Sequence, residues 1–314
     1  MIELAADPIE LSPGTPEWVR EMTASKVAAV LGLSPWESRF SLWYRMAGEL
    51  GDDPETAVQS RGHYLEPAVA AWLADQYGLD MLPGLCWRNR ARPWQEASPD
   101  RRTADAVVEV KTAAEAEPWG RDGSDEIPMY YRAQVVWQCD TLGLPKGYVG
   151  VLLPRLEFRG YVITPEPGEA DWIRAEVRTF LDSLAEGVPP DVDAHGATYK
   201  TLRALHPGIE ADRDVVVPDE LARAYAASVV ALRDAKTRAQ YEQNRMALAL
   251  GDARRAVLDQ PEAKSPTVVA QRQPGPTGVP YVAATRSKRT LASLAALYDP
   301  SAAPVVEAPP EEDL

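Results

Sequence analysis

The sequence predicts an α/β sandwich in which helices flank a central mixed sheet. The main reason is the order of its segments, which runs helix, strands, helix, strands, helix up to residue 184. Residues 107–112 have the β-branched composition and period-two alternation of a strand. Two further apolar segments, 147–153 and 158–163, look like adjacent strands around Pro154-Arg155.

Capping residues and glycines mark the ends of the expected helices. Thr23 or Ser25 is a candidate N-cap for a helix that ends at Gly32, and Gly78 and Gly143 stop the helices before them. The Pro-rich, acidic residues 1–16 are expected to be a loose lead-in. The first expected helix runs from the Thr23 or Ser25 cap to Gly32, and the others are 35–48, 55–77, 128–143 and 169–184. The weaker strands are 81–87 and 96–98, and 115–127 is a polar loop.

A change in composition near Gly187 divides the chain. We expect a folded core at 1–188, a C-terminal extension at 189–298 and a disordered tail at 299–314 that holds five acidic and no basic residues. The elements expected in the extension are a short helix at 199–205, an Ala-rich helix at 219–250 with a helical continuation at 253–258, paired strands at 267–271 and 281–284, and a last helix at 291–298.

Composition excludes several classes of protein. The 314 residues are 45% hydrophobic with nine Trp, enough for a substantial core, and neither a membrane span nor a secretory signal is visible. Two cysteines and three histidines argue against a disulfide framework and against zinc or iron–sulfur centres, and favour a reducing compartment. A net charge of −14 argues against broad coating of nucleic acid, although it leaves a nuclease with a local basic groove open.

One stretch combines strand character with chemistry. In Glu109-Val110-Lys111, side chains two apart share a face, so Glu109 and Lys111 point one way while Val108 and Val110 point into a core. With Asp100 from the preceding turn, this carboxylate and ammonium can hold a divalent cation and a water beside it. The alternative is an edge strand with a solvated polar face, which the triplet alone favours.

Glu66 is a second candidate, because it lies on or beside the apolar side of the helix over 55–77. A carboxylate that faces the interior needs a partner, which is either a metal or a cation such as Arg61. Gly62, one turn earlier, is expected to permit close backbone approach.

Two groups of polar residues are candidates for phosphate binding. Ser25 and Lys26 at a helix start, with Arg20 just before them, can grip a phosphate at the positive end of the helix dipole, and ordinary capping is the alternative. Gln134 and Gln138 share a helix face and can bond a phosphate or a metal-bound water. The alternative is that the two glutamines have no binding role and are either exposed or part of a polar interface.

Together these motifs resemble the YqaJ-like viral recombinase family, which includes phage lambda-type exonuclease, within the PD-(D/E)XK nuclease superfamily. The likeness covers roughly residues 18–185, and 219–298 is also similar to a C-terminal extension of YqaJ-like phage proteins. The stretches that carry it are Thr23-Ala24-Ser25 with Gly32-Leu33-Ser34-Pro35, the helix segment Arg61-Gly62-His63-Tyr64-Leu65-Glu66-Pro67, Ser98-Pro99-Asp100 followed by Glu109-Val110-Lys111, and the Gln-rich segment 131–143.

The resemblance implies a PD-(D/E)XK restriction-endonuclease-like core and a role for each matching residue. Asp100 and Glu109 would be Mg²⁺ ligands, with Mn²⁺ as a substitute, and two ions would bind near them. Lys111 would position or activate the attacking water, and Glu66 would complete or orient the metal site. The residues expected to bind substrate or phosphate are Ser25, Arg20, Arg61, Gln134 and Gln138.

The implied function is a metal-dependent DNA exonuclease that acts 5′ to 3′ on double-stranded DNA ends during phage-type homologous recombination. The implied partners are those DNA ends, a single-strand annealing recombinase and further copies of the chain, for example in a toroidal trimer. The expected location is the cytoplasm of a bacterial host, for a phage or prophage protein. The alternatives are a related endonuclease or repair nuclease, and a non-catalytic DNA-end-binding module with the same fold.

Three positions depart from the family pattern. Val136 stands where the family often has Gln, so one amide contact is either missing or supplied by Gln138. Arg101 replaces the usual Gly after Ser-Pro-Asp, so that turn is expected to differ. Asp105 is an extra carboxylate on the expected face of Glu109, where it can compete as a ligand.

Overall fold

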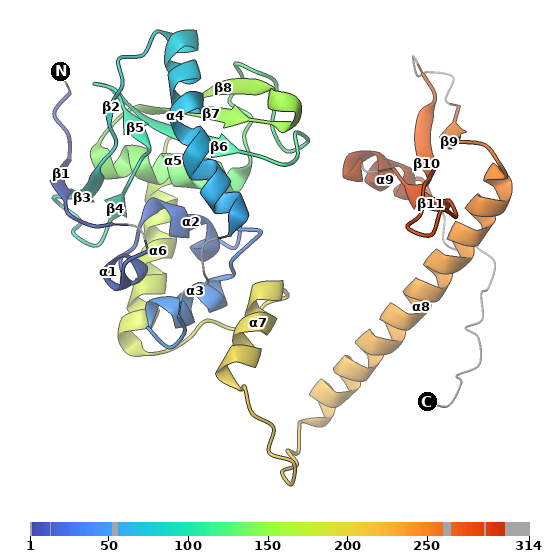
Figure 1. Ribbon diagram of the computed structural model, residues 1–314. Helices are drawn as coiled ribbons and strands as arrows, with labels where there is room; N and C mark the ends of the chain where they lie inside the picture. Colours follow the sequence, from blue (N-terminus) through green and yellow to red (C-terminus); the bar gives the residue numbers. More distant parts are fainter. Residues whose placement is uncertain (1, 13, 52–55, 260–264, 286, 299–314) are drawn as a thin grey trace. The chain divides into compact units, whose positions relative to one another are not determined.

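A computed structural model gives the fold, and it describes residues 2–12, 14–51, 56–259, 265–285 and 287–298, without the side chains of Lys288 and Arg289. The chain divides into two compact units, Met1–Ile209 and Glu210–Leu314. Each unit has its own secondary structure and is described by itself (Figure 1).

A five-stranded mixed sheet lies at the centre of the first unit (Figure 1). Its strand order is β2-β5-β6-β7-β8; β6 and β7 run parallel, and the other neighbouring pairs are antiparallel. This arrangement confirms the expected α/β fold with a central mixed sheet. The strands are β2 (Leu82–Pro83), β5 (Arg101–Arg102), β6 (Ala106–Thr112), β7 (Lys146–Leu152) and β8 (Phe158–Ile163).

Two helices cover opposite faces of this sheet. α4 (Ala57–Tyr77) packs against Val110, and α5 (Met129–Leu142) packs in the main core together with Val107. Because neighbouring residues of a strand point to opposite faces, the odd-numbered positions of β6, Glu109 among them, face α5. The strand thus places a carboxylate between the sheet and a helix.

A smaller antiparallel sheet, β1-β3-β4, precedes the site along the chain. β1 (Ala6–Ile9) pairs with β3 (Cys86–Asn89), and β4 (Glu96–Ala97) pairs with the other edge of β3. The expected loose lead-in over residues 1–16 is therefore wrong for the residues of β1, because pairing with a distant strand orders them.

The first predicted helix begins at its expected cap, and the second begins later than the sequence predicted. The helix expected between a Thr23 or Ser25 cap and Gly32 is α2 (Ala24–Val30), and its N-cap residue is Thr23. A separate helix, α1 (Pro16–Arg20), precedes it, because Glu21 and Thr23 have extended backbone angles. α3 (Arg39–Met46) begins after Ser38, whose hydroxyl accepts the backbone N–H of N3 and caps the helix. The expected start at Pro35-Trp36 is therefore wrong, and Trp36 lies in the loop before the helix.

Two further helices complete the first unit. They are α6 (Glu169–Glu186) and α7 (Gly196–Leu205). α7 packs against α3, where the Thr198 hydroxyl bonds Ser38 Oγ over 2.7 Å. The first unit therefore extends beyond the boundary at residue 188 that composition suggested. The assignment of functional domains stays a prediction.

The second unit consists of a long helix, a small sheet and a short helix. The sheet has the order β11-β10-β9 and is antiparallel. The helical continuation expected at 253–258 is wrong, because residues there pair with β10 as a strand. The predicted acidic tail lies outside the described residues. The elements are α8 (Asp219–Leu250), β9 (Arg255–Leu258), β10 (Thr267–Gln273), β11 (Tyr281–Ala284) and α9 (Lys288–Ala295).

The described helices are too short or too polar for a membrane-spanning role. This holds for every helix in the ranges that the structure covers. This agrees with the sequence, in which no apolar run approaches the ~20 residues of a membrane span.

Candidate functional site

Glu109 is the centre of the candidate site, and both oxygens of its carboxylate are held. Oε1 accepts a hydrogen bond of 2.7 Å from Gln134 Nε2 and forms an ion pair with Lys111. Oε2 accepts a hydrogen bond of 2.7 Å from Gln138 Nε2. The expectation that Glu109 and Lys111 share a face is confirmed, and the solvated edge strand is excluded because Glu109 is buried on a strand with two neighbours.

Asp100 joins this centre from the turn before β5. Its Oδ2 accepts a hydrogen bond of 2.6 Å from the backbone N–H of Val110, which holds the carboxyl group beside β6. Burial, followed by the negative charge of Glu109, raises the pKa of Asp100 to about 8, although the Lys111 ammonium acts in the opposite direction. At neutral pH this carboxyl group therefore carries a proton in much of the metal-free protein.

Lys111 is a cation at neutral pH. Burial alone would lower its pKa, but the carboxylates of Glu109 and Asp100 raise the pKa overall. Its Nζ also lies 5.0 Å from the ring centroid of Tyr131, within range of a cation–π interaction. As an ammonium group, Lys111 can donate hydrogen bonds and stabilise negative charge.

Glu66 is bound to a cation, and that cation is Arg101 rather than Arg61. Nη1 of Arg101 donates a hydrogen bond of 2.8 Å to Glu66 Oε1 and a second one to the backbone carbonyl of Asp100. The negative charge of Glu66 still raises the pKa of Asp100, so the two carboxyl groups are close. Glu66 therefore lies beside the centre but points its carboxylate at a guanidinium group.

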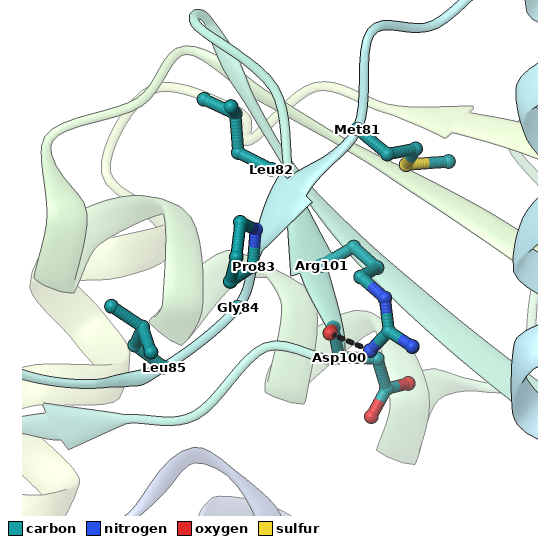
Figure 2. A pocket seen from close by; sticks show the side chains of 7 residues that line it. All are labelled: Met81, Leu82, Pro83, Gly84, Leu85, Asp100 and Arg101. Atoms are coloured by element: carbon teal, nitrogen blue, oxygen red, sulfur yellow. Dashed lines mark hydrogen bonds between the residues drawn. The ribbon is translucent and has the colours of Figure 1, made fainter.

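A hollow next to Asp100 is lined mainly by apolar residues (Figure 2). Figure 2 shows Asp100 and the guanidinium of Arg101 together at one end of it. The lining residues are Met81, Leu82, Pro83, Gly84, Leu85, Asp100 and Arg101.

Gly84 determines how closely the two walls of this hollow approach each other. A Cβ atom at Gly84 would lie 1.8 Å from the carbonyl oxygen of Pro99 and 2.8 Å from the carbonyl carbon of Asp100. The absence of a side chain at Gly84 therefore lets the strand pair β2–β5 hold Asp100 in place.

Gly84→Ala is expected to lower the free energy of unfolding by about 1–3 kcal/mol or more, because the backbone of Asp100 must move away from the new methyl group. Denaturant unfolding measures the change. Gly62→Ala is the matched control, since a Cβ there meets only Thr112 Oγ1 at 3.9 Å. The expected close approach at Gly62 is wrong, and this control should be neutral or stabilising; equal destabilisation by both variants would contradict the assignment.

The residues predicted to bind phosphate lie on several elements. Ser25 is exposed on α2, and its Oγ lies 3.3 Å from Thr23 Oγ1. Arg20 on α1 and Arg61 on α4 are also exposed. Across the described part of the chain, no hydrogen bond or ion pair links these three residues to Glu109. Only the two glutamines of the predicted set contact the centre.

Lys26 contributes to the packing of α2 against α1. It is buried, its Nζ donates to the backbone carbonyls of Trp18 and Glu21, and it lies 4.0 Å from the ring centroid of Trp18. Lys26 therefore joins α2 to α1 and does not face solvent. Its predicted contribution to phosphate binding is wrong.

The departures from the family pattern have local explanations. Val136 is buried in the main core, and Gln138 supplies the second amide contact to Glu109. Asp105 does not compete as a ligand, because it pairs with Lys146 at 3.1 Å near the start of β6. A hydrogen bond from Thr103, followed by Lys146, lowers the pKa of Asp105.

The donor set fits a hard divalent cation. Asp100 and Glu109 place two carboxyl groups against one ammonium, and the excess negative charge is a cause of the raised pKa of Asp100. Glu109 Oε2 accepts one bond and so keeps a lone pair, and Gln138 Oε1 is buried without a partner among the residues described. Mg²⁺ needs only one or two carboxylates besides water and phosphate.

No group of three or more His, Cys, Asp or Glu side chains in the described ranges is arranged to hold a metal ion. Glu66, the third carboxylate, is paired with Arg101. Asp100 and Glu109 are thus the two carboxylates available to a cation.

Three residues at the site were not predicted to act there. Arg101 was noted only as a departure, and its pairing with Glu66 joins positions 35 residues apart in sequence. Tyr131 lies under Lys111, and Trp36 contacts the Tyr131 and Tyr130 rings. In the sequence, only the aromatic residues before Gln134 could have indicated the role of Tyr131, and such residues are equally typical of a hydrophobic core.

Comparisons with known proteins agree with this geometry at the level of family. The family model of the YqaJ-like viral recombinase domain matches residues 18–143, which include the whole candidate site. None of the curated proteins matches the chain.

Among solved structures, an alkaline exonuclease from Laribacter hongkongensis is 19% identical over 62% of this chain and 100% of its own, with a TM-score of 0.46. The complex of that exonuclease with dAMP gives 20% identity over the same shares and a TM-score of 0.47. A phage related exonuclease from Haemophilus somnus 129PT is 10% identical over 53% of this chain and 94% of its own, with a TM-score of 0.41.

The motifs that carry the resemblance all lie within the segment that the family model matches, which ends at residue 143. Glu66, Asp100, Glu109, Lys111 and the two glutamines all lie within the matched residues. Residues 18–143 of this chain match the model of the YqaJ-like viral recombinase domain.

Proposed function

We propose that the protein is a Mg²⁺-dependent DNA exonuclease that acts 5′ to 3′ on double-stranded DNA ends in phage-type homologous recombination. The observation that supports this most is the buried Glu109, which is held by two amides and one ammonium with Asp100 beside it. A carboxylate constrained in this way, next to a carboxyl group of raised pKa, is typical of a functional site. The matched family supports DNA as the substrate.

In this proposal Asp100 and Glu109 hold the cation, and Mn²⁺ can replace Mg²⁺. When bound, Mg²⁺ supplies positive charge for the phosphodiester and lowers the pKa of a water. Water adds to phosphorus, the bond from phosphorus to O3′ breaks, and the leaving oxygen takes a proton. Glu66 completes or orients the site after it separates from Arg101.

The remaining residues orient the reacting groups. Gln134 and Gln138 keep the Glu109 carboxylate in one orientation, which lowers the reorganisation needed during reaction. Lys111 donates hydrogen bonds to the attacking water or to the phosphate and stabilises the charge that develops there. Ser25, Arg20 and Arg61 bind backbone phosphates of the DNA end.

The proposal includes partners and location. The substrate is a duplex DNA end, a single-strand annealing recombinase receives the resulting strand, and several copies of the chain, for example three, surround the duplex. The protein acts in the cytoplasm of a bacterial host. Gel filtration with light scattering, with and without duplex DNA, measures the number of copies.

Glu109→Ala is expected to lower the rate of hydrolysis of linear duplex DNA by roughly 10³-fold or more, because charge stabilisation worth several kcal/mol is lost. The assay compares wild type with this variant in Mg²⁺, in Mn²⁺ and in EDTA. Glu157→Ala is the matched control, since Glu157 is a partly exposed carboxylate beside β8 that pairs with Arg159. Full activity of Glu109→Ala would refute the assignment.

The form of the substrate tests the remaining features. Preference for linear duplex with a 5′ phosphate over the same duplex without it, and inactivity on closed circular DNA, are expected of a 5′-end exonuclease. Cleavage of circular DNA would instead indicate an endonuclease or repair nuclease. Binding of DNA ends without hydrolysis in either metal would indicate a non-catalytic module.

A further inference from the structure

An aromatic cluster connects the candidate centre to solvent. Trp36 and Tyr130 meet edge to face with ring centroids 5.1 Å apart, and Trp36 lies 6.1 Å from Tyr131. Tyr130 and Tyr131 are 4.5 Å apart. At its inner end, Tyr131 packs on the buried Trp119, and at its outer end Trp36 is 65% exposed.

The loop that carries Trp36 is held in one conformation. Ser34 Oγ accepts the backbone N–H groups of Trp36 and Glu37 over 3.2 and 3.1 Å. The Glu37 carboxylate receives a hydrogen bond of 2.9 Å from Arg45 Nε and forms a second bond with the same guanidinium. The exposed indole therefore has a fixed base, which lowers the entropy lost when a ligand contacts it.

The cluster lies directly beside the groups proposed to act on phosphate. Tyr131 contacts the ammonium of Lys111, whose Nζ is 5.0 Å from the ring centroid. Tyr130 is one helical turn, about 6 Å along α5, from Gln134, which bonds Glu109. A phosphate at Glu109 would thus bring its own nucleotide or the next one to the rings of Trp36 and Tyr130.

Core packing accounts for the positions of Tyr131 and Trp119 but not for the exposed ring of Trp36. Tyr131 and Trp119 belong to the main core, whereas most of the Trp36 indole is in water, where a large apolar ring is unfavourable. A nucleobase has a flat π face that stacks on such a ring, and this contact tolerates any base sequence.

We propose that Trp36 and Tyr130 form a stacking platform for the nucleobase next to the phosphate on which Asp100, Glu109 and Lys111 act. This inference rests on the proposed function in taking DNA as the ligand and Asp100 and Glu109 as the place of its phosphate. The platform holds the end of the strand while Lys111 and Glu109 act on its phosphate, and it is independent of sequence. Trp36 is a binding residue in this assignment.

The test uses the full chain and a 20-base-pair duplex in Ca²⁺, with 2-aminopurine at the first, second or tenth nucleotide of the 5′-ending strand. Trp36→Ala is expected to raise the Kd for the duplex end roughly 5- to 150-fold, the range for loss of one stacked base. Fluorescence quenching at the first or second position should disappear, and the tenth should not change. Trp36→Phe should recover most of the affinity and the quenching.

Trp172→Ala is the matched control, because Trp172 is 54% exposed on α6. It should bind like wild type. Wild-type affinity and quenching in Trp36→Ala, or an equal loss in Trp172→Ala, would overturn the platform. So would a loss of binding in Trp36→Phe equal to that in Trp36→Ala.

The outcomes separate this inference from the proposed function. Quenching that depends on Trp36 in a chain that hydrolyses no DNA would support the platform and refute the nuclease. Hydrolysis by wild type, with no quenching that depends on Trp36, would support the nuclease and refute the platform.

Discussion

Lys111→Met is expected to lower kcat on linear duplex DNA by roughly 10²- to 10⁴-fold, the range for removal of a positioned proton donor or charge-stabilising group. The reason is that Lys111 is the ammonium bound to Glu109, and no other ion pair to that carboxylate is found in the residues described. Methionine keeps a long apolar side chain against Tyr131, so packing changes little. Single-turnover hydrolysis in saturating Mg²⁺ measures the effect.

Lys146→Met is the control, because it makes the same substitution on the neighbouring strand. Lys146 lies on β7 and pairs with Asp105, away from Glu109. It should keep kcat within a few fold of wild type. Thermal unfolding of both variants separates loss of catalysis from loss of fold. An active Lys111→Met alongside an inactive Glu109→Ala would remove Lys111 from the mechanism.

Without metal, the wild type is expected to become less stable as the pH rises from about 4 to about 8. Asp100→Asn is expected not to show this decrease. Burial, followed by Glu109, raises the pKa of Asp100 from 3.8 to about 8. A raised folded-state pKa means that the native protein binds the proton more tightly than the unfolded chain. The stabilisation is complete below about pH 4 and is lost as the pH rises through about 8.

At pH 8 the free energies of unfolding of wild type and Asp100→Asn should differ by on the order of a few kcal/mol, since one pKa unit corresponds to about 1.4 kcal/mol. Urea unfolding in EDTA at several pH values measures it, and Asp100→Asn should be more stable than wild type at pH 8. Asp105→Asn is the control, because the pKa of Asp105 is lowered instead and its contribution is lost only in acid. Identical pH slopes in wild type and Asp100→Asn would contradict the assignment.

The elements that follow from local chemistry were predicted correctly. α4 and α5 end at Gly78 and Gly143, both in the left-handed conformation that glycine adopts at low cost. The alternation in β6 placed Glu109 and Lys111 on one face because successive strand side chains point to opposite sides. These properties depend on neighbours within a few residues.

Elements that depend on distant partners were not predicted. Ala6–Ile9 is a strand because it pairs with Cys86–Asn89, and Arg255–Leu258 is a strand because it pairs with β10. In both places the local composition favoured another conformation, and the hydrogen bonds of the sheet overrode it.

The chain's motifs alone identified which side chains could meet a cation, since Asp100, Glu109 and Lys111 lie in one short stretch around a turn and a strand. Tertiary packing decided how each is used. It placed the amides of α5 on Glu109, raised the pKa of Asp100 by burial, and paired Glu66 with Arg101. Sequence spacing describes which residues are neighbours along the chain, whereas charge, burial and hydrogen bonding depend on neighbours in space.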